Sequence, residues 1–184
     1  MGARLVPSPQ ARNTLEHLVQ SGAIDGDKAV AWKANLKHEE EVKELRAKAN
    51  KGDADAMYKL GRLAMKLCIS NPDLVQARVW FERAAELDHV KGLAQASNYN
   101  LSGVGGPSIP ALGLVYAARA AEAGSDLAAY VLGNAFLKGT YGLPQSNAQA
   151  KRYLGMVAEG KGVHLHLMSS HVEEATQLLQ SLVS

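Results

Sequence analysis

The stretch Trp80-Phe81-Glu82-Arg83-Ala84-Ala85-Glu86 decides the fold, because its pattern returns along the chain. Its last three residues recur as Ala120-Ala121-Glu122 and, weakened, as Val157-Ala158-Glu159, at intervals of about 36 residues. Each copy carries an aromatic residue at the same place before its last alanine: Trp80, Tyr116 and Tyr153. Self-similarity at this period is typical of stacked helix pairs, because one pair cannot bury its apolar face alone. The sequence therefore predicts an all-α protein, an α-solenoid of stacked antiparallel helix pairs.

A second element precedes each copy of the first. Ala56-Met57-Tyr58-Lys59-Leu60-Gly61 reappears as Ala128-Ala129-Tyr130-Val131-Leu132-Gly133, and a blurred version runs from Gly92 to Ser97. We interpret this element as the first helix of each pair. Gly61 and Gly133 are expected where two helices cross at close range, since a larger side chain would push the helices apart.

These elements divide the chain into three parts. Residues 1–37 are expected to form an N-terminal helical cap, whose second helix ends near Lys37. Residues 38–162 are expected to hold the repeats: a degraded half unit with a helix over 38–51, then full units over 52–88, 89–124 and 125–160. Residues 163–184 are expected to supply a C-terminal capping helix, which closes the open end of the stack. Within the units, helices are predicted over 54–67 and 72–87, 91–102 and 110–123, and 127–138 and 147–159.

The repeated residues resemble the Sel1-like repeat family, which is related to tetratricopeptide repeats. The matching pattern in the first full unit is Gly52-Asp53-Ala54-Asp55-Ala56, Leu60-Gly61, Asp73, Ala77, Trp80-Phe81 and Ala84-Ala85-Glu86. In the second unit Ser97 stands where the family has glycine, and Gly105-Gly106-Pro107 lengthens the loop. The resemblance covers about residues 38–162. It implies a right-handed solenoid that serves as a protein-interaction scaffold, as in adaptors of signalling and protein quality control.

Composition narrows the function classes. Hydrophobic residues make up 47% of the chain and charged residues 21%, which is ordinary for a folded soluble protein. A net charge of +2 argues against nucleic acid as a partner. We expect no membrane span, because no apolar run is long enough. The single cysteine, Cys68, is expected to be a buried hydrophobe, which favours the cytoplasm or another reducing compartment and leaves import into an organelle open.

Candidate chemical motifs are few. The loop from Ser102 to Pro107 is rich in glycine but lacks the lysine and hydroxyl residue of a phosphate-binding loop, so we interpret it as a turn. His164, His166 and His171 form the one histidine cluster, and no cysteine or carboxylate joins them at a metal-binding spacing. No nucleophile, histidine and acid combination stands out. We therefore expect no catalytic residue, metal or cofactor, and the role of the three histidines stays open.

The predicted binding surface is the concave side of the first helices, where exposed positions recur every three to four residues. Amides there can clamp the backbone of an extended peptide, and tyrosines can supply flat contact. The candidate residues are Asp55, Tyr58, Arg62, Lys66, Asn98, Tyr130, Asn134 and Lys138.

The sequence favours a noncatalytic adaptor that binds a protein or peptide, either as a monomer or within a hetero-complex. The alternative is a structural subunit of a larger assembly, and a hydrolytic enzyme is the third possibility.

Overall fold

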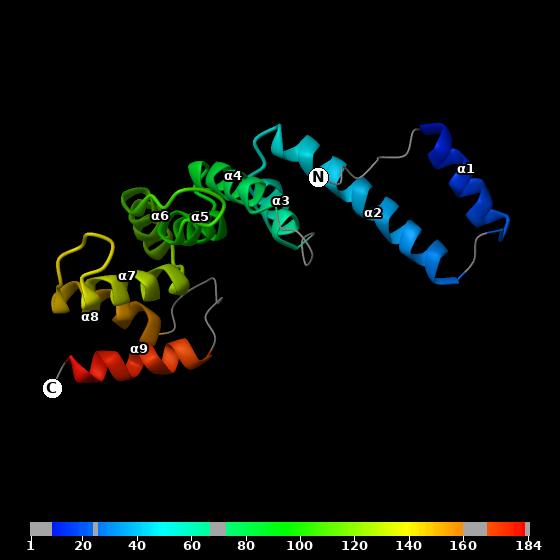
Figure 1. The fold of residues 1–184 in the computed structure, drawn as a ribbon. Coiled ribbons are helices and arrows are strands. Elements are labelled where there is room, and N and C mark those ends of the chain that lie inside the picture. Colours follow the sequence, from blue (N-terminus) through cyan, green and yellow to red (C-terminus); the bar gives the residue numbers. More distant parts are fainter. Residues whose placement is uncertain (1–8, 24–25, 67–72, 160–168, 183–184) are drawn as a thin grey trace. The chain divides into compact units, whose positions relative to one another are not determined.

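The computed structural model describes residues 9–23, 26–66, 73–159 and 169–182, which form nine helices and no strand (Figure 1). The predicted all-α class is therefore confirmed. The helices are α1 (Pro9–Gln20), α2 (Gly26–Ala49), α3 (Ala54–Lys66), α4 (Leu74–Glu86), α5 (Val90–Ser102), α6 (Pro110–Glu122), α7 (Asp126–Lys138), α8 (Asn147–Ala158) and α9 (Ser169–Ser181).

The chain divides into two compact units, Met1–Glu44 and Leu45–Ser184. The first unit contains α1 and most of α2. The second unit contains the last turn of α2, where Leu45 and Ala49 are buried, and all helices from α3 to α9. The repeats and every candidate binding residue lie in this second unit, which is called the repeat unit below.

The helix α2 differs from the prediction. Two separate helices were expected, one ending near Lys37 and one over 38–51, but a single helix runs from Gly26 to Ala49. The sequence offers no reason for a break, because neither glycine nor proline occurs between Asp27 and Lys51. Alanine, glutamate, lysine and leucine fill this stretch, and all four are strong helix formers.

The repeat unit is a stack of helix pairs, as predicted. The first helices α3, α5 and α7 pack against the second helices α4, α6 and α8 of the same pair, and α4 and α6 also pack against the first helix of the next pair. The last helix, α9, packs against α8 in the same way. It therefore takes the place of a fourth first helix at the end of the stack (Figure 1).

The start of each first helix repeats in atomic detail. The residue before the helix caps it in all three pairs: Asp53 Oδ1 accepts a hydrogen bond from the Ala56 amide, His89 Nδ1 from Gly92, and Ser125 Oγ from Ala128. The residue before each cap has a positive φ, at Gly52, Asp88 and Gly124. Asp88 takes the place of glycine because aspartate tolerates the left-handed conformation better than most residues. The repeat is thus confirmed at the level of the turns.

The two glycines predicted at helix crossings do lie at close contacts. A β-carbon on Gly61 would lie 2.6 Å from Phe81 Cε1, and one on Gly133 would lie 2.7 Å from Leu154 Cγ. In the middle pair the corresponding positions are Ser97 and Ala117, both buried. A larger residue on the first helix is therefore matched by a smaller one on the second, so the two helices of the middle pair can also pack closely.

The repeated aromatic position differs in burial between the three pairs. Trp80 is only half-buried, and the guanidinium carbon of Arg83 lies 5.0 Å from its ring centroid. The core residue is its neighbour Phe81, which is fully buried. Tyr116 and Tyr153, the equivalents of Trp80, are buried. The larger indole therefore extends to the surface, where a cation covers it.

Candidate functional site

The candidate site is the outward side of α3, α5 and α7. The repeat places three of the predicted residues at one equivalent position, Arg62, Asn98 and Asn134, and the helical period adds the residues one turn away. We call this surface the first-helix face. The structure brings five predicted residues to it with at least part of their side chain exposed: Asp55, Arg62, Asn98, Asn134 and Lys138. The side chain of Lys66 lies outside the described residues.

Tyr58 does not belong to this exposed surface. It is 7% exposed, and its ring centroid lies 5.8 Å from that of Phe81 and 5.0 Å from that of His89. The ring therefore fills the joint between α3 and the start of α5. The prediction of a surface tyrosine was wrong because the next repeat covers this position.

Tyr130 is half-buried for a related reason. Its hydroxyl donates a hydrogen bond to Glu174 Oε2 at 2.6 Å, and its ring meets that of His171 edge to face at 5.0 Å. Burial and, after it, the carboxylate of Glu174 raise the pKa of Tyr130 to about 12. Both contacts come from α9. Tyr130, which was predicted to bind a partner, therefore packs against the C-terminal helix of the same chain.

The two asparagines of the first-helix face are not equivalent. The side chain of Asn98 is exposed and makes no hydrogen bond to a described residue. Asn134 instead donates through Nδ2 to the carbonyl oxygen of Tyr130 at 3.2 Å, and its buried Oδ1 has no partner among the described residues. Asn98 is therefore free to bind a peptide backbone, whereas Asn134 is partly engaged by its own helix.

The charged residues of the face are concentrated on α3. Asp55 and Lys59 form an ion pair at 2.6 Å, and the Nε2 atom of His89 lies 3.7 Å from the same carboxylate. The hydrogen bond from Lys59, opposed by partial burial and assisted by neighbouring cations, lowers the pKa of Asp55. Arg62 is exposed and makes neither an ion pair nor a hydrogen bond to any described residue. Its guanidinium is therefore available to an anion.

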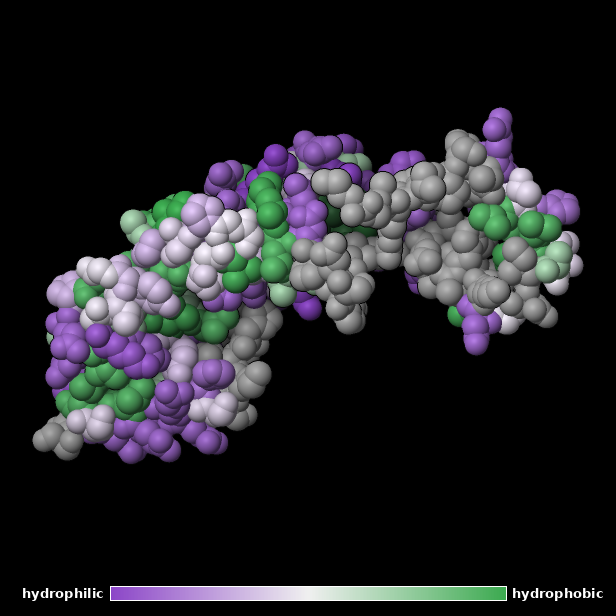
Figure 2. Space-filling model, viewed as in Figure 1, coloured by the Kyte–Doolittle hydropathy of each residue, from purple (hydrophilic) through white to green (hydrophobic). Residues whose placement is uncertain are grey.

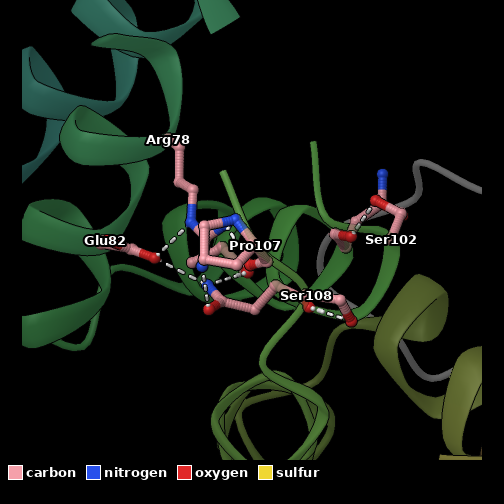
Figure 3. A network of polar contacts seen from close by, with 8 residues as sticks. Arg78, Glu82, Ser102, Pro107 and Ser108 are labelled. Carbon is pink, nitrogen blue, oxygen red and sulfur yellow. Dashed lines mark hydrogen bonds and ion pairs between the residues drawn. The ribbon is translucent and has the colours of Figure 1, made fainter. Parts of the chain in front are cut away.

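Sequence reasoning missed a largely buried polar network that joins α4, α5 and the loop before α6 (Figure 3). The guanidinium of Arg78 donates to Glu82 Oε1 at 2.9 Å, to Asn100 Oδ1 at 2.6 Å and to the Pro107 carbonyl oxygen at 2.8 Å. Asn100 donates in turn to Glu82 Oε1 at 2.7 Å.

This network ties the glycine-rich loop to α4. At Gly105 a side chain would overlap the carbonyl oxygen of Leu74, so only glycine permits this close approach. The loop is thus a packed structural element, in agreement with the prediction of a turn. The available signal was that Asn100 has no polar counterpart, because Ala64 and Phe136 occupy its place in the other two pairs.

Two further features bear on the kind of site. Among the residues that the structure describes, no three histidine, cysteine, aspartate or glutamate side chains gather as metal ligands, and His164 and His166 lie outside those residues. No helix in the described ranges is long and apolar enough to cross a membrane. On the side seen in Figure 2, hydrophilic side chains surround smaller hydrophobic areas over the repeat unit.

Comparisons with known proteins agree with this architecture. No protein-family model matches the sequence, and no curated protein matches it either. Among solved structures, the chain is similar to a Sel1 repeat protein from Oxalobacter formigenes, with 26% identity and a TM-score of 0.60 over 75% of this chain and 96% of that one. It also shares its fold with c5321, a protective antigen of uropathogenic Escherichia coli with an SLR fold, at 22% identity and a TM-score of 0.58. That alignment covers 78% of this chain but only 33% of the antigen.

The stacked pairs and their repeated contacts define the class of the protein as an α-solenoid repeat protein. The similarity to the solved structures specifies it further. The chain is similar to Sel1-like repeat proteins in sequence and fold, and the resemblance inferred from the sequence is confirmed.

Proposed function

We propose that this protein is a noncatalytic scaffold that binds a protein or peptide partner on the first-helix face of the repeat unit. The observation that carries the proposal is a row of exposed polar side chains that make no hydrogen bond or ion pair with described residues. Arg62, Asn98 and Lys138 are exposed on three successive first helices, and their side chains form no hydrogen bond or ion pair with described residues. The cost of desolvating such groups is offset when a partner supplies complementary hydrogen bonds and charges.

The spacing of these groups supports binding rather than catalysis. Catalytic groups must converge on one reacting atom, at separations of about 3 Å. Here the candidate groups recur once per helix pair, and packed helices are about 10 Å apart. An extended chain rises about 3.3 Å per residue, so about three partner residues would span each step. Repeat proteins use extended surfaces of this kind to bind other proteins.

The test is capture of partners on the full chain with two matched triple variants. The first replaces Arg62, Asn98 and Lys138 with alanine. The second replaces Glu86, Glu122 and Arg152, which are exposed on the second helices, with alanine. Proteins captured from the source cell are identified by mass spectrometry, and circular dichroism verifies that both variants fold.

We expect the first variant to lose a partner that the wild type and the second variant retain. Loss on the second variant alone would overturn the proposal and place the binding site on the second helices. Equal retention by both variants would also overturn it. That result would favour a structural subunit held through the ends of the stack.

A further inference from the structure

The first-helix face changes in chemical character from one end to the other. Three equivalent positions per helix recur at the repeat interval: Asp55, Lys59 and Arg62 on α3; Lys91, Gln95 and Asn98 on α5; Leu127, Val131 and Asn134 on α7. The residues are thus all charged on α3, mostly neutral and polar on α5, and mostly apolar on α7. A binding surface graded in this way distinguishes the two ends of its ligand.

The charged end has an excess of positive charge. The single carboxylate, Asp55, is engaged by Lys59 at 2.6 Å and faces His89 at 3.7 Å. Lys91 contributes a further positive charge near the same carboxylate. The side chain of Arg62 is exposed, and it has no acidic partner among the described residues. An exposed guanidinium with no partner can take a carboxylate in a two-bond, coplanar arrangement.

The opposite end offers apolar contact. Leu127 and Val131 on α7 are half-buried, so each leaves part of its side chain uncovered by the fold. Asn98 lies between the two ends and is free to hydrogen bond with a peptide backbone through both its donor and its acceptor. The distance from α3 to α7 is two helix steps, which about six residues of extended chain would cover.

From this gradient we infer that the occupant of the first-helix face is an extended peptide segment with acidic residues at one end and aliphatic residues at the other. The acidic end lies over α3, where Arg62 binds a carboxylate, and the aliphatic end lies over Leu127 and Val131 of α7. The inference rests on the function proposed above, because it names the class of partner for the same surface. It also fixes the orientation of the segment across the stack.

The test uses short synthetic peptides labelled with fluorescein, whose anisotropy reports binding to the full chain. One peptide carries a run of glutamates followed by a run of leucines, and a second has the same residues in reverse order. In a third, lysines replace the glutamates, and in a fourth, serines replace the leucines. We expect one of the two glutamate–leucine peptides to bind, and the third and fourth to bind at least tenfold more weakly.

Variants of the protein then locate the two ends. R62E should weaken the binding of this peptide about tenfold or more at low salt. The loss should be smaller at high salt, because salt screens the attraction between Arg62 and the glutamates of the peptide. V131S should weaken it by a similar factor at both salt concentrations, because that contact is apolar. The matched control is R83E, which makes the same charge change on the second helix α4 and should leave the affinity unchanged.

The outcomes separate this inference from the proposed function. Equal binding of the lysine–leucine peptide, or binding of no peptide at all, would overturn the acidic and aliphatic partner class. The scaffold function would still stand if the captured partner depends on Arg62, Asn98 and Lys138. Conversely, peptide binding that R83E abolishes and R62E leaves intact would place the site on the second helices and overturn both.

Discussion

The ring of Phe81 fills the space beside Gly61 in which any other residue would place its β-carbon, at only 2.6 Å from Phe81 Cε1. Phe81 is fully buried, so its ring cannot move aside without disturbing the core. The relationship explains why the repeat has glycine on the first helix wherever the second helix presents a bulky side chain.

Replacing Gly61 with alanine should therefore destabilise the protein although alanine is the better helix former. Overpacking costs about 1–3 kcal/mol, which exceeds the gain in helix propensity of about 1 kcal/mol. We expect a net loss of about 1 kcal/mol in the free energy of unfolding, measured by urea denaturation.

Gly155 on α8 provides the matched control, because a β-carbon there would meet nothing within 4 Å. Gly155→Ala should raise the free energy of unfolding by about 0.5–1 kcal/mol. Equal effects of the two substitutions would contradict the close crossing at Gly61.

The Arg78 network predicts a second, local effect. Arg78→Ala would leave the fully buried Asn100 and the carboxylate of Glu82 without their shared donor. Removing one member of a buried ionic network costs about 3–5 kcal/mol, and the partial exposure of Glu82 reduces this to about 3 kcal/mol here. Hydrogen exchange should quicken at the amide of Ile109, which donates to the Asn100 carbonyl oxygen. Unchanged exchange there would show that Arg78 does not anchor the loop.

The contact between α7 and α9 predicts a pH-dependent effect. Because the folded state raises the pKa of Tyr130 from 10 to about 12, its stabilising contribution is complete below pH 10 and is lost as the pH rises toward 12. Ultraviolet absorbance should show a tyrosine that ionises near pH 12 in the wild type and is missing in Tyr130→Phe.

Replacing Glu174 with glutamine should lower the pKa of Tyr130 only in part. The substitution removes the negative charge, but burial, the larger cause of the shift, stays. The same absorbance titration checks this result. A return of the pKa all the way to 10 would mean that α9 itself had left its place beside α7.

The repeated caps give a prediction at the joint between the first two pairs. His89→Ala should cost about 1 kcal/mol, because the Gly92 amide loses its acceptor. His89→Ser should recover most of this loss in the same denaturation experiment, since serine caps the equivalent helix at Ser125. If alanine and serine behaved alike at this position, the capping role of His89 would be wrong.

The sequence was sufficient for the features that repeat. Equal spacing identified the helix pairs, and the glycine in Leu60-Gly61 and Leu132-Gly133 located the crossings, because small residues at a fixed period have few other uses. The same reasoning failed where one pair covers another. Tyr58 has the helical phase of an exposed residue, and only the position of His89 in the next pair shows that it is buried.

Contacts that occur in only one helix pair could not be predicted from the sequence either. The contacts of Arg78 with Asn100 and Pro107 join residues that are far apart in sequence and occur in one pair only. The contact of Glu174 with Tyr130 likewise depends on where α9 packs, which periodicity does not fix. For the candidate site, the repeat pattern located the first-helix face. It did not show which residues of that face already contact other parts of the same chain.

The most direct test of the account is site-specific photo-crosslinking to a captured partner. A benzophenone amino acid is placed either at Ser102 on the first helix α5 or at Glu122 on the second helix α6, both of which are exposed. We expect a crosslinked complex from position 102 and none from position 122. A crosslink from position 122 alone would contradict the claim that the first helices bind the partner.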